Sequence, residues 1–266
     1  MNKKQSVLLS LLTSTPIGAL GGLIGLGGAE FRLPVLLGML KLSARKAVAM
    51  NIAISLITII SSIIFRIPKI SISTLLPLSL VMFSIIVGSM TGAYFGADFS
   101  KKVTESLLKN TILILLIFIG CLLICEGFVP FITGGINFGH VSIKVLVGVF
   151  CGLIIGFISS LLGVAGGELI IPILILIFGV DIKIAGTVSL LISLPTILIG
   201  ISKNASNKMY SDKKDFTSLI LPMGIGSIIG AFIGAALVSM ISSEIIRLLL
   251  GILLIFSALK LFIEKK

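Results

Sequence analysis

The sequence predicts an all-α integral membrane protein with two inverted-topology repeats, each a broken or re-entrant helical hairpin plus three full transmembrane helices. Three observations lead to this prediction: a strongly apolar composition, apolar runs of membrane-spanning length, and an internal copy at a fixed offset. Of the 266 residues, 57% are hydrophobic and 12% are charged, whereas soluble domains carry roughly 25% charged residues. A soluble or disordered chain is therefore excluded, and the 3 cysteines exclude a disulfide scaffold.

The length of the apolar runs sets the number of crossings, because a bilayer core of roughly 30 Å needs about 20 apolar residues per helix. Six uninterrupted runs meet this length: 47–65, 75–97, 106–125, 184–202, 216–238 and 245–263. Two further apolar stretches, 6–40 and 144–178, are each interrupted by a Gly-rich segment that contains one Glu. We expect these two stretches to be broken helices that re-enter the membrane.

An internal repeat relates the two broken stretches. A shift of 138 positions superimposes the glycines, the glutamate and the proline of the Gly-rich segments: Gly25, Gly28, Glu30 and Pro34 over Gly163, Gly166, Glu168 and Pro172. We therefore expect repeat 1 at 1–126, a linker at 127–139 and repeat 2 at 140–266. Because the N-terminal segment has an internal copy, we expect it to be structural rather than a cleaved signal peptide.

The basic residues indicate how the copies are oriented. If each copy crosses the membrane an odd number of times, fifteen of the 21 Lys and Arg residues lie on the side of the N-terminus, as the positive-inside rule requires. Five lie on the other side, Arg66, Lys69, Lys144, Lys183 and Arg247, and Arg32 lies within the first hairpin. Odd parity inverts the second copy and places both termini in the cytoplasm. The distribution of basic residues fits two topologies equally well: five membrane crossings per copy, or three crossings and a re-entrant hairpin per copy.

The net charge of +11 does not indicate nucleic-acid binding, because the basic residues form short clusters between apolar runs. The predicted partners are the lipid bilayer and a small anion. No cofactor is expected. No metal site is expected either, because no carboxylate or His accompanies Cys121, Cys125 and Cys151.

The two Gly-rich breaks form the candidate substrate site. Irregular backbone at membrane depth is tolerated only inside protein or along a watery cavity, and a half-helix that starts there directs its amides toward an anion. The predicted pocket is lined by residues of both copies: Gly25, Gly27, Gly28, Ala29, Arg32 and Asn51 from the first, and Gly163, Gly166, Gly167 and Ser189 from the second.

Glu30 and Glu168 have two readings that both remain open. A carboxylate at membrane depth is a functional candidate by default, and it would couple proton movement to anion transport. Alternatively, each Glu caps its half-helix and complements the helix dipole. Arg32 is expected to pair with Glu30 or with an oxyanion of the substrate. The second copy has Ile170 at this position, so the site is predicted to be asymmetric.

The segments GGAEFRLP and AGGELIIP resemble the Gly-rich motif of the sulfite exporter TauE/SafE family, also called the toluenesulfonate uptake permease family. The resemblance covers essentially the whole chain. The motif falls on Gly25, Gly27, Gly28 and Pro34 and on Gly163, Gly166, Gly167 and Pro172, with Ala29 and Ala165 where glycine is usual. The resemblance implies a prokaryotic inner-membrane transporter for sulfite, sulfonates or other small sulfur-containing or carboxylate anions.

The predicted function is transport of such an anion by alternating access of the two copies. One alternative is an intramembrane lipid-diphosphate phosphatase, which also uses inverted repeats with Glu-bearing hairpins. That enzyme needs a nucleophile and several cations around a phosphate, and the second break contains no Arg or His. We therefore expect no catalytic residues. Another alternative is an anion channel, which needs a continuous polar path.

Overall fold

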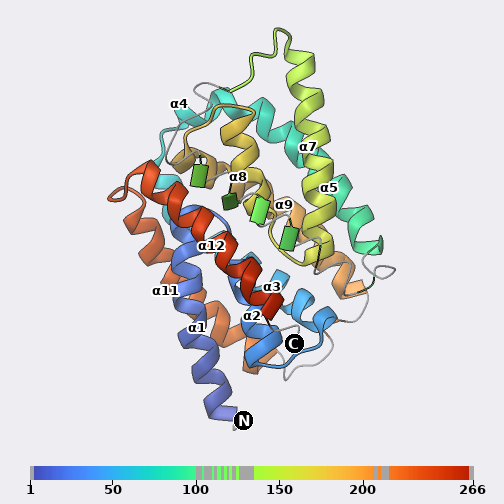
Figure 1. Ribbon diagram of the computed structural model, residues 1–266, viewed down its shortest axis with the longest axis vertical. Helices are drawn as coiled ribbons and strands as arrows, with labels where there is room; N and C mark the ends of the chain where they lie inside the picture. The colour runs from blue at the N-terminus through green and yellow to red at the C-terminus, as the bar shows by residue number, and fades with distance from the viewer. Residues whose placement is uncertain are drawn as a thin grey trace.

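The computed structural model describes residues 3–99, 135–206, 209–210 and 216–263, together with isolated positions between 104 and 125. All regular elements in these residues are helical, and no strand occurs among them (Figure 1). The predicted all-α class is therefore confirmed for the described part of the chain. Most of the predicted helix 106–125 and residues 127–134 of the predicted linker lie outside the described residues.

The first half begins with a long helix, a break and a short helix. These are α1 (Lys3–Ile24), α2 (Ala29–Pro34) and a π-helical turn, η1 (Val35–Met39). Next comes α3 (Ala44–Arg66), which covers the predicted helix 47–65. Three short elements then lead into α5 (Ser79–Phe99): η2 (Ile67–Lys69), α4 (Ile72–Leu75) and η3 (Leu76–Leu78). The predicted helix 75–97 is interrupted at its start by η3, which contains Pro77, a residue without an amide hydrogen to donate.

The second half follows the same order. It contains α7 (Val141–Leu162), α8 (Gly167–Leu176), α9 (Ile182–Ser206), η4 (Phe216–Ile220), α11 (Leu221–Leu237) and α12 (Ser243–Ile263). The predicted helix 216–238 is thus divided between η4 and α11. The first residues of α7, α8 and α9 each lie 138 positions after those of α1, α2 and α3.

The two arms of each broken stretch differ in length, and the second arm is the half-helix that the sequence predicted. α1 and α7 contain 22 residues each, and at about 1.5 Å per residue this length matches the bilayer core. The second arm is short, with 10 residues in α8 and with 6 and 5 in α2 and η1. Each broken stretch therefore joins a helix of spanning length to a half-length helix.

The long arms pack on helices of the opposite half. α1 lies along α11 and α7 lies along α5 (Figure 1). The contacts are made by glycines at four-residue spacing: Gly88, Gly92 and Gly96 on α5, and Gly226, Gly230 and Gly234 on α11. A methyl group at any of these positions would overlap the backbone of the partner helix. Small residues therefore allow the close helix approach that the spacing predicted.

α3 and α9 occupy the centre and run antiparallel. Arg66, at the end of α3, donates a hydrogen bond to Thr187 near the start of α9 at 2.9 Å. At the opposite ends, a methyl group on Gly200 of α9 would lie 3.7 Å from the side chain of Ile52 in α3. These two helices begin at equivalent positions of the two halves, and both border the breaks.

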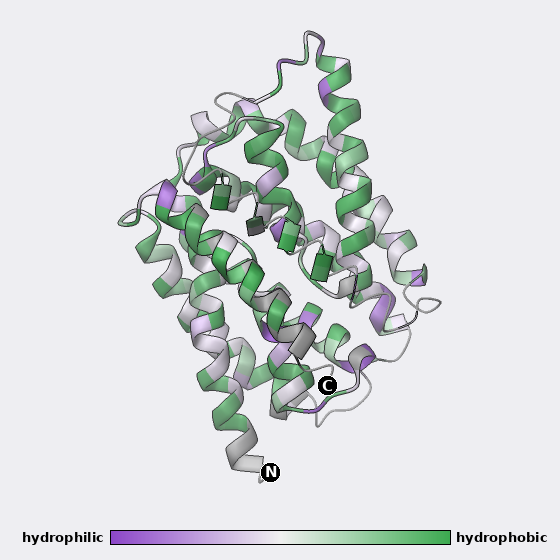
Figure 2. Ribbon diagram, in the orientation of Figure 1, coloured by the Kyte–Doolittle hydropathy of each residue, from purple (hydrophilic) through white to green (hydrophobic). Residues whose placement is uncertain are grey.

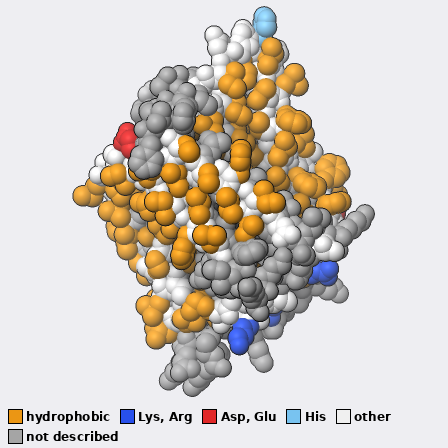
Figure 3. Space-filling view, viewed as in Figure 1, with side chains coloured by type: hydrophobic (Ala, Val, Ile, Leu, Met, Phe, Trp, Pro, Cys, Tyr) orange, Lys and Arg blue, Asp and Glu red, His pale blue; other side chains and the backbone are white. Residues whose placement is uncertain are grey.

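The outer surface is apolar, as a lipid-facing surface must be. Five helical segments in the described residues are long and apolar enough to cross a bilayer: Val7–Ile24, Arg45–Lys69, Ile72–Phe99, Val141–Leu161 and Ile182–Ser206. Hydrophobic residues predominate along the helices (Figure 2). They also cover the middle of the face in Figure 3, whereas the visible Lys and Arg side chains lie at its lower edge. Phe83 and Phe150 are 66% and 63% exposed.

Candidate functional site

Both breaks are made by glycines with left-handed backbone. Their φ angles are between 67° and 97°: Gly25, Gly27 and Gly28 in the first break, and Gly163 and Gly166 in the second. A side chain disfavours this conformation. Ala29 and Ala165, which replace glycines of the motif, are absent from the described residues with positive φ. A methyl group is therefore tolerated at these two positions.

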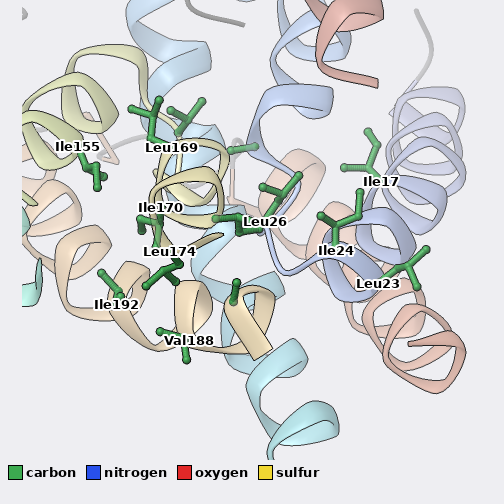
Figure 4. Packing of buried hydrophobic residues seen from close by; sticks show 14 of the residues in the cluster. Ile17, Leu23, Ile24, Leu26, Ile155, Leu169, Ile170, Leu174, Val188 and Ile192 are labelled. Atoms are coloured by element: carbon green, nitrogen blue, oxygen red, sulfur yellow. The ribbon is translucent and has the colours of Figure 1, made fainter. Parts of the chain in front are cut away.

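The two breaks contact each other in the interior of the protein. A methyl group on Gly167 would lie 3.0 Å from the Cα atom of Leu26, and one on Gly27 would lie 3.3 Å from the Cβ atom of Ala165. Leu26 lies between Ile170 and Leu174 of α8 on one side and Ile24 of α1 on the other (Figure 4). Segments far apart in the sequence thus form one centre.

Hydrogen bonds cross between the halves at equivalent positions. In the first half, Asn51 Nδ2 donates to the Gly163 carbonyl of the second break at 2.9 Å. In the second half, Ser189 Oγ donates to the Gly25 carbonyl of the first break. Asn51 also donates to the Ala29 carbonyl at 2.9 Å. From the sequence, Asn51 and Ser189 could either donate to a substrate or form interhelical hydrogen bonds, and in this conformation their donors join the two breaks.

The guanidinium group of Arg32 is fully buried and is held by polar groups of α3. Its Nη1 donates to Ser55 Oγ at 2.9 Å and to Asn51 Oδ1 at 3.2 Å. Its Nη2 donates to Thr58 Oγ1 at 3.0 Å and to Ser227 Oγ at 3.4 Å. The roles of Ser55 and Thr58 as partners of Arg32 were not predicted. Ile170, the equivalent of Arg32, is buried in the apolar core.

Glu30 and Glu168 are the second residues of the two short helices α2 and α8. They are only 3% and 2% exposed. Neither oxygen of Glu30 has a hydrogen-bond partner among the described residues, and Oε2 of Glu168 has none either. Glu30 forms no ion pair with Arg32, whose donors reach neutral groups instead. The cap reading therefore has no hydrogen bond from Glu30 to support it.

The structure brings every predicted site residue to the two breaks or to the helices beside them, where the described polar side chains are buried. Glu30, Arg32, Asn51 and Ser189 are at most 3% exposed. A void of about 10 Å³ lies beside the second break, lined in part by Ser159 and Thr196, which is room for about one water molecule.

No group of three or more His, Cys, Asp or Glu side chains gathers within the described residues. The polar groups at the breaks are carboxylates, a guanidinium, an amide and hydroxyls. This set suits binding and proton movement.

Arg66 directly follows the predicted helix 47–65 in the sequence, and in the structure it is the last residue of α3. Its side chain is 2% exposed at the end of α3. It donates to the carbonyls of Gly22 and Leu23 in the last turn of α1 at 2.9 and 3.0 Å, and to the Lys183 carbonyl at 2.7 Å. It therefore satisfies orphan carbonyls just before the first break. The absence of any turn residue between Arg66 and the apolar run 47–65 is the signal that indicated a helical position.

A family model described as "Sulfite exporter TauE/SafE" matches residues 1–123 and 148–266. Neither a curated protein nor a solved structure matches the chain.

Proposed function

The chain belongs to the sulfite exporter TauE/SafE family of membrane transporters, and on this basis we propose that it moves a small sulfur-containing or carboxylate anion by alternating access. The observation that carries the proposal is the contact between the two Gly-rich breaks inside the protein. Broken helices that meet at membrane depth are typical of transporter binding sites. Because the centre is closed, transport requires it to open to each side in turn.

The proposal includes an inverted arrangement of the two repeats, 1–126 and 140–266. Its support is that α3 and α9 are equivalent in position and antiparallel in direction. The pair α1 and α11 also has the same glycine contacts as the pair α7 and α5. Two such bundles that rock about the shared centre would expose it alternately. Hydrogen bonds of Asn51 and Ser189 to the opposite break would then break and re-form during the cycle.

The proposed substrate site consists of the predicted residues of both breaks: Gly25, Gly27, Gly28, Ala29, Arg32, Asn51, Gly163, Gly166, Gly167 and Ser189. Arg32 supplies the positive charge, and it becomes available to an oxyanion when its hydroxyl partners move away. Glu30 and Glu168 are proposed to carry protons. Their burial and unpartnered oxygens support this role, because a charged carboxylate without partners is costly inside a membrane.

We further propose that the protein lies in a prokaryotic inner membrane with both termini in the cytoplasm. The distribution of basic residues supports this orientation. The marks for the N- and C-terminal ends both lie in the lower half of Figure 1, on the side where the visible Lys and Arg side chains of Figure 3 lie.

The function is tested by flux of sulfite, thiosulfate, sulfonates and short carboxylates into sealed vesicles that contain the purified protein. A carrier gives flux that saturates with anion concentration and that one anion inhibits for another. Flux that rises linearly without saturation contradicts alternating access and favours a channel. Release of phosphate from a lipid diphosphate favours the phosphatase instead.

Proton coupling is tested with Glu30→Gln and Glu168→Gln, assayed as flux against pH. The amide keeps the size of the side chain but carries no titrating proton, so we expect each variant to lose pH dependence. Glu244→Gln is the matched control, because Glu244 is exposed at the start of α12. Unchanged pH dependence in both buried variants eliminates the proton role.

A further inference from the structure

A further cavity lies outside the two breaks, where α3, η2, α4, α9 and the end of α11 meet. Its volume is about 310 Å³, which corresponds to about ten water molecules. Exposed residues such as Lys69, Ser71 and Asp181 form part of its wall, so the cavity opens at the surface. Its floor includes the buried Arg66 and Thr187.

The cavity has an excess of positive charge. Three cations line it, Arg66, Lys69 and Lys183, against the single carboxylate of Asp181. None of the three forms an ion pair with a carboxylate in the described part of the chain, where Lys203 and Asp98 do form one. Asp181 is already engaged, because Oδ1 accepts the Lys183 amide at 2.9 Å and Oδ2 accepts the Ser243 hydroxyl at 3.0 Å.

Two of the three cations, Lys69 and Arg66, are held in place by neutral acceptors. Lys69 Nζ donates to the Ala235 carbonyl at the end of α11 at 2.7 Å, which leaves two of its three donors for another group. Arg66 is fixed by Thr187 and by the carbonyls of α1 and α9. Hydroxyl groups of Ser71 and Thr74 complete the wall. Cations and hydroxyls around a water-filled cavity suit a small oxyanion.

The cavity is adjacent to the first break. Arg66 lies between the cavity and the first break, because its guanidinium group lines the cavity and donates hydrogen bonds to carbonyls in the last turn of α1. The opposite half has no equivalent set of cations: Asn204 stands at the position of Arg66, and Arg45 stands at that of Lys183. The positive cavity is thus a feature of one face of the protein.

We propose that this cavity is an oxyanion-binding vestibule, in which Lys69, Lys183 and Arg66 hold a sulfite-like or phosphate-like group next to the first break. Binding there does not need the centre to open. The inference extends the proposed function, since it adds a docking site at one mouth of the proposed path, but the site itself does not depend on transport.

The test is calorimetric titration of the full chain with sodium sulfite in a neutral detergent, compared with sodium chloride at equal ionic strength. We expect millimolar or tighter binding of sulfite. In Lys69→Gln and Lys183→Gln combined, the affinity should fall about tenfold or more, because two partly solvated charges are removed. Arg66 is left unchanged because its substitution would leave buried carbonyls unpaired.

Two further variants separate binding from a structural effect. Arg45→Gln, at the position of the other half that matches Lys183, should leave the affinity unchanged. Asp181→Asn removes the only negative charge of the wall, while Oδ1 still accepts the Lys183 amide and Nδ2 donates to Ser243 Oγ, so sulfite should bind about threefold more tightly. Equal affinity in the lysine double variant and in Arg45→Gln overturns the proposal, and so does an absence of sulfite binding in the unaltered protein.

The source of the oxyanion is identified by repeating the titration in nanodiscs of phosphatidylcholine with and without phosphatidylglycerol. Sulfite binding that persists with the anionic lipid shows that the vestibule takes a free anion. Sulfite binding that the anionic lipid suppresses, with the same dependence on Lys69 and Lys183, assigns it to a lipid phosphate. If sulfite binds to the protein but no anion flux is measured in vesicles, the vestibule proposal is supported and the proposed transport function is contradicted.

Discussion

The hydrogen bonds of Asn51 lead to a prediction about how firmly the two breaks are joined. Asn51→Ala removes two donated bonds, to the Ala29 and Gly163 carbonyls, and one bond accepted from Arg32. Ser189→Ala, at the equivalent position, removes the bond to Gly25 of the opposite break. The first variant should therefore be clearly less stable than the second.

The expected loss of stability follows from the number of hydrogen bonds that each variant removes. A side-chain hydrogen bond within a membrane protein contributes about 0.6 kcal/mol on average and at most about 1.7 kcal/mol. Asn51→Ala should thus lower the free energy of unfolding by about 2–5 kcal/mol, and Ser189→Ala by about 0.6–1.7 kcal/mol. Ser61→Ala is the control, because Ser61 donates only to Ile57 of its own helix and should change stability by less than about 0.5 kcal/mol.

The measurement is thermal unfolding of the purified variants in one detergent, followed by circular dichroism. For a chain of this size, 1 kcal/mol shifts the midpoint by about 2–4 °C. The midpoints should rank Ser61→Ala highest, Ser189→Ala next and Asn51→Ala lowest. If Asn51→Ala unfolds together with Ser61→Ala, the breaks are not joined through Asn51 and the closed centre described above is incorrect.

Two other predictions concern single positions. Gly186→Ala should destabilise the protein by about 2–4 kcal/mol, because its methyl group would overlap the Ile24 carbonyl. Gly200→Ala should stabilise the protein by up to about 1 kcal/mol, because the nearest atom to its methyl group is 3.7 Å away. Equal thermal shifts of the two variants would contradict the contact between α9 and the end of α1. Burial raises the pKa of Tyr210 to about 12, above about 10 in an unfolded chain. The contribution of Tyr210 to stability is thus complete below about pH 10 and is lost as the pH rises toward 12. Tyr210→Phe should weaken this alkaline loss in thermal unfolding, and an identical pH profile would exclude Tyr210 as its source.

Properties that depend on local sequence were predictable. Apolar runs of spanning length indicated helices, and the ranges for α3 and α9 differ from the observed bounds by a few residues. The breaks were also visible, because only glycine readily takes the left-handed backbone at positions such as Gly25 and Gly163. The offset of 138 residues pointed to the same two segments.

The hydrogen-bond partners of the residues at the breaks depend on packing between helices that are distant in the sequence. Asn51 reaches a carbonyl 112 residues away, and no periodicity in the chain specifies that pairing. The same holds for Arg66, because the carbonyl oxygens that hold it in a buried position come from the ends of α1 and α9. The length of an apolar run and the position of glycines determine helices and breaks locally, within one stretch of sequence. The acceptors for a buried cation come from several helices and exist only after these helices have assembled.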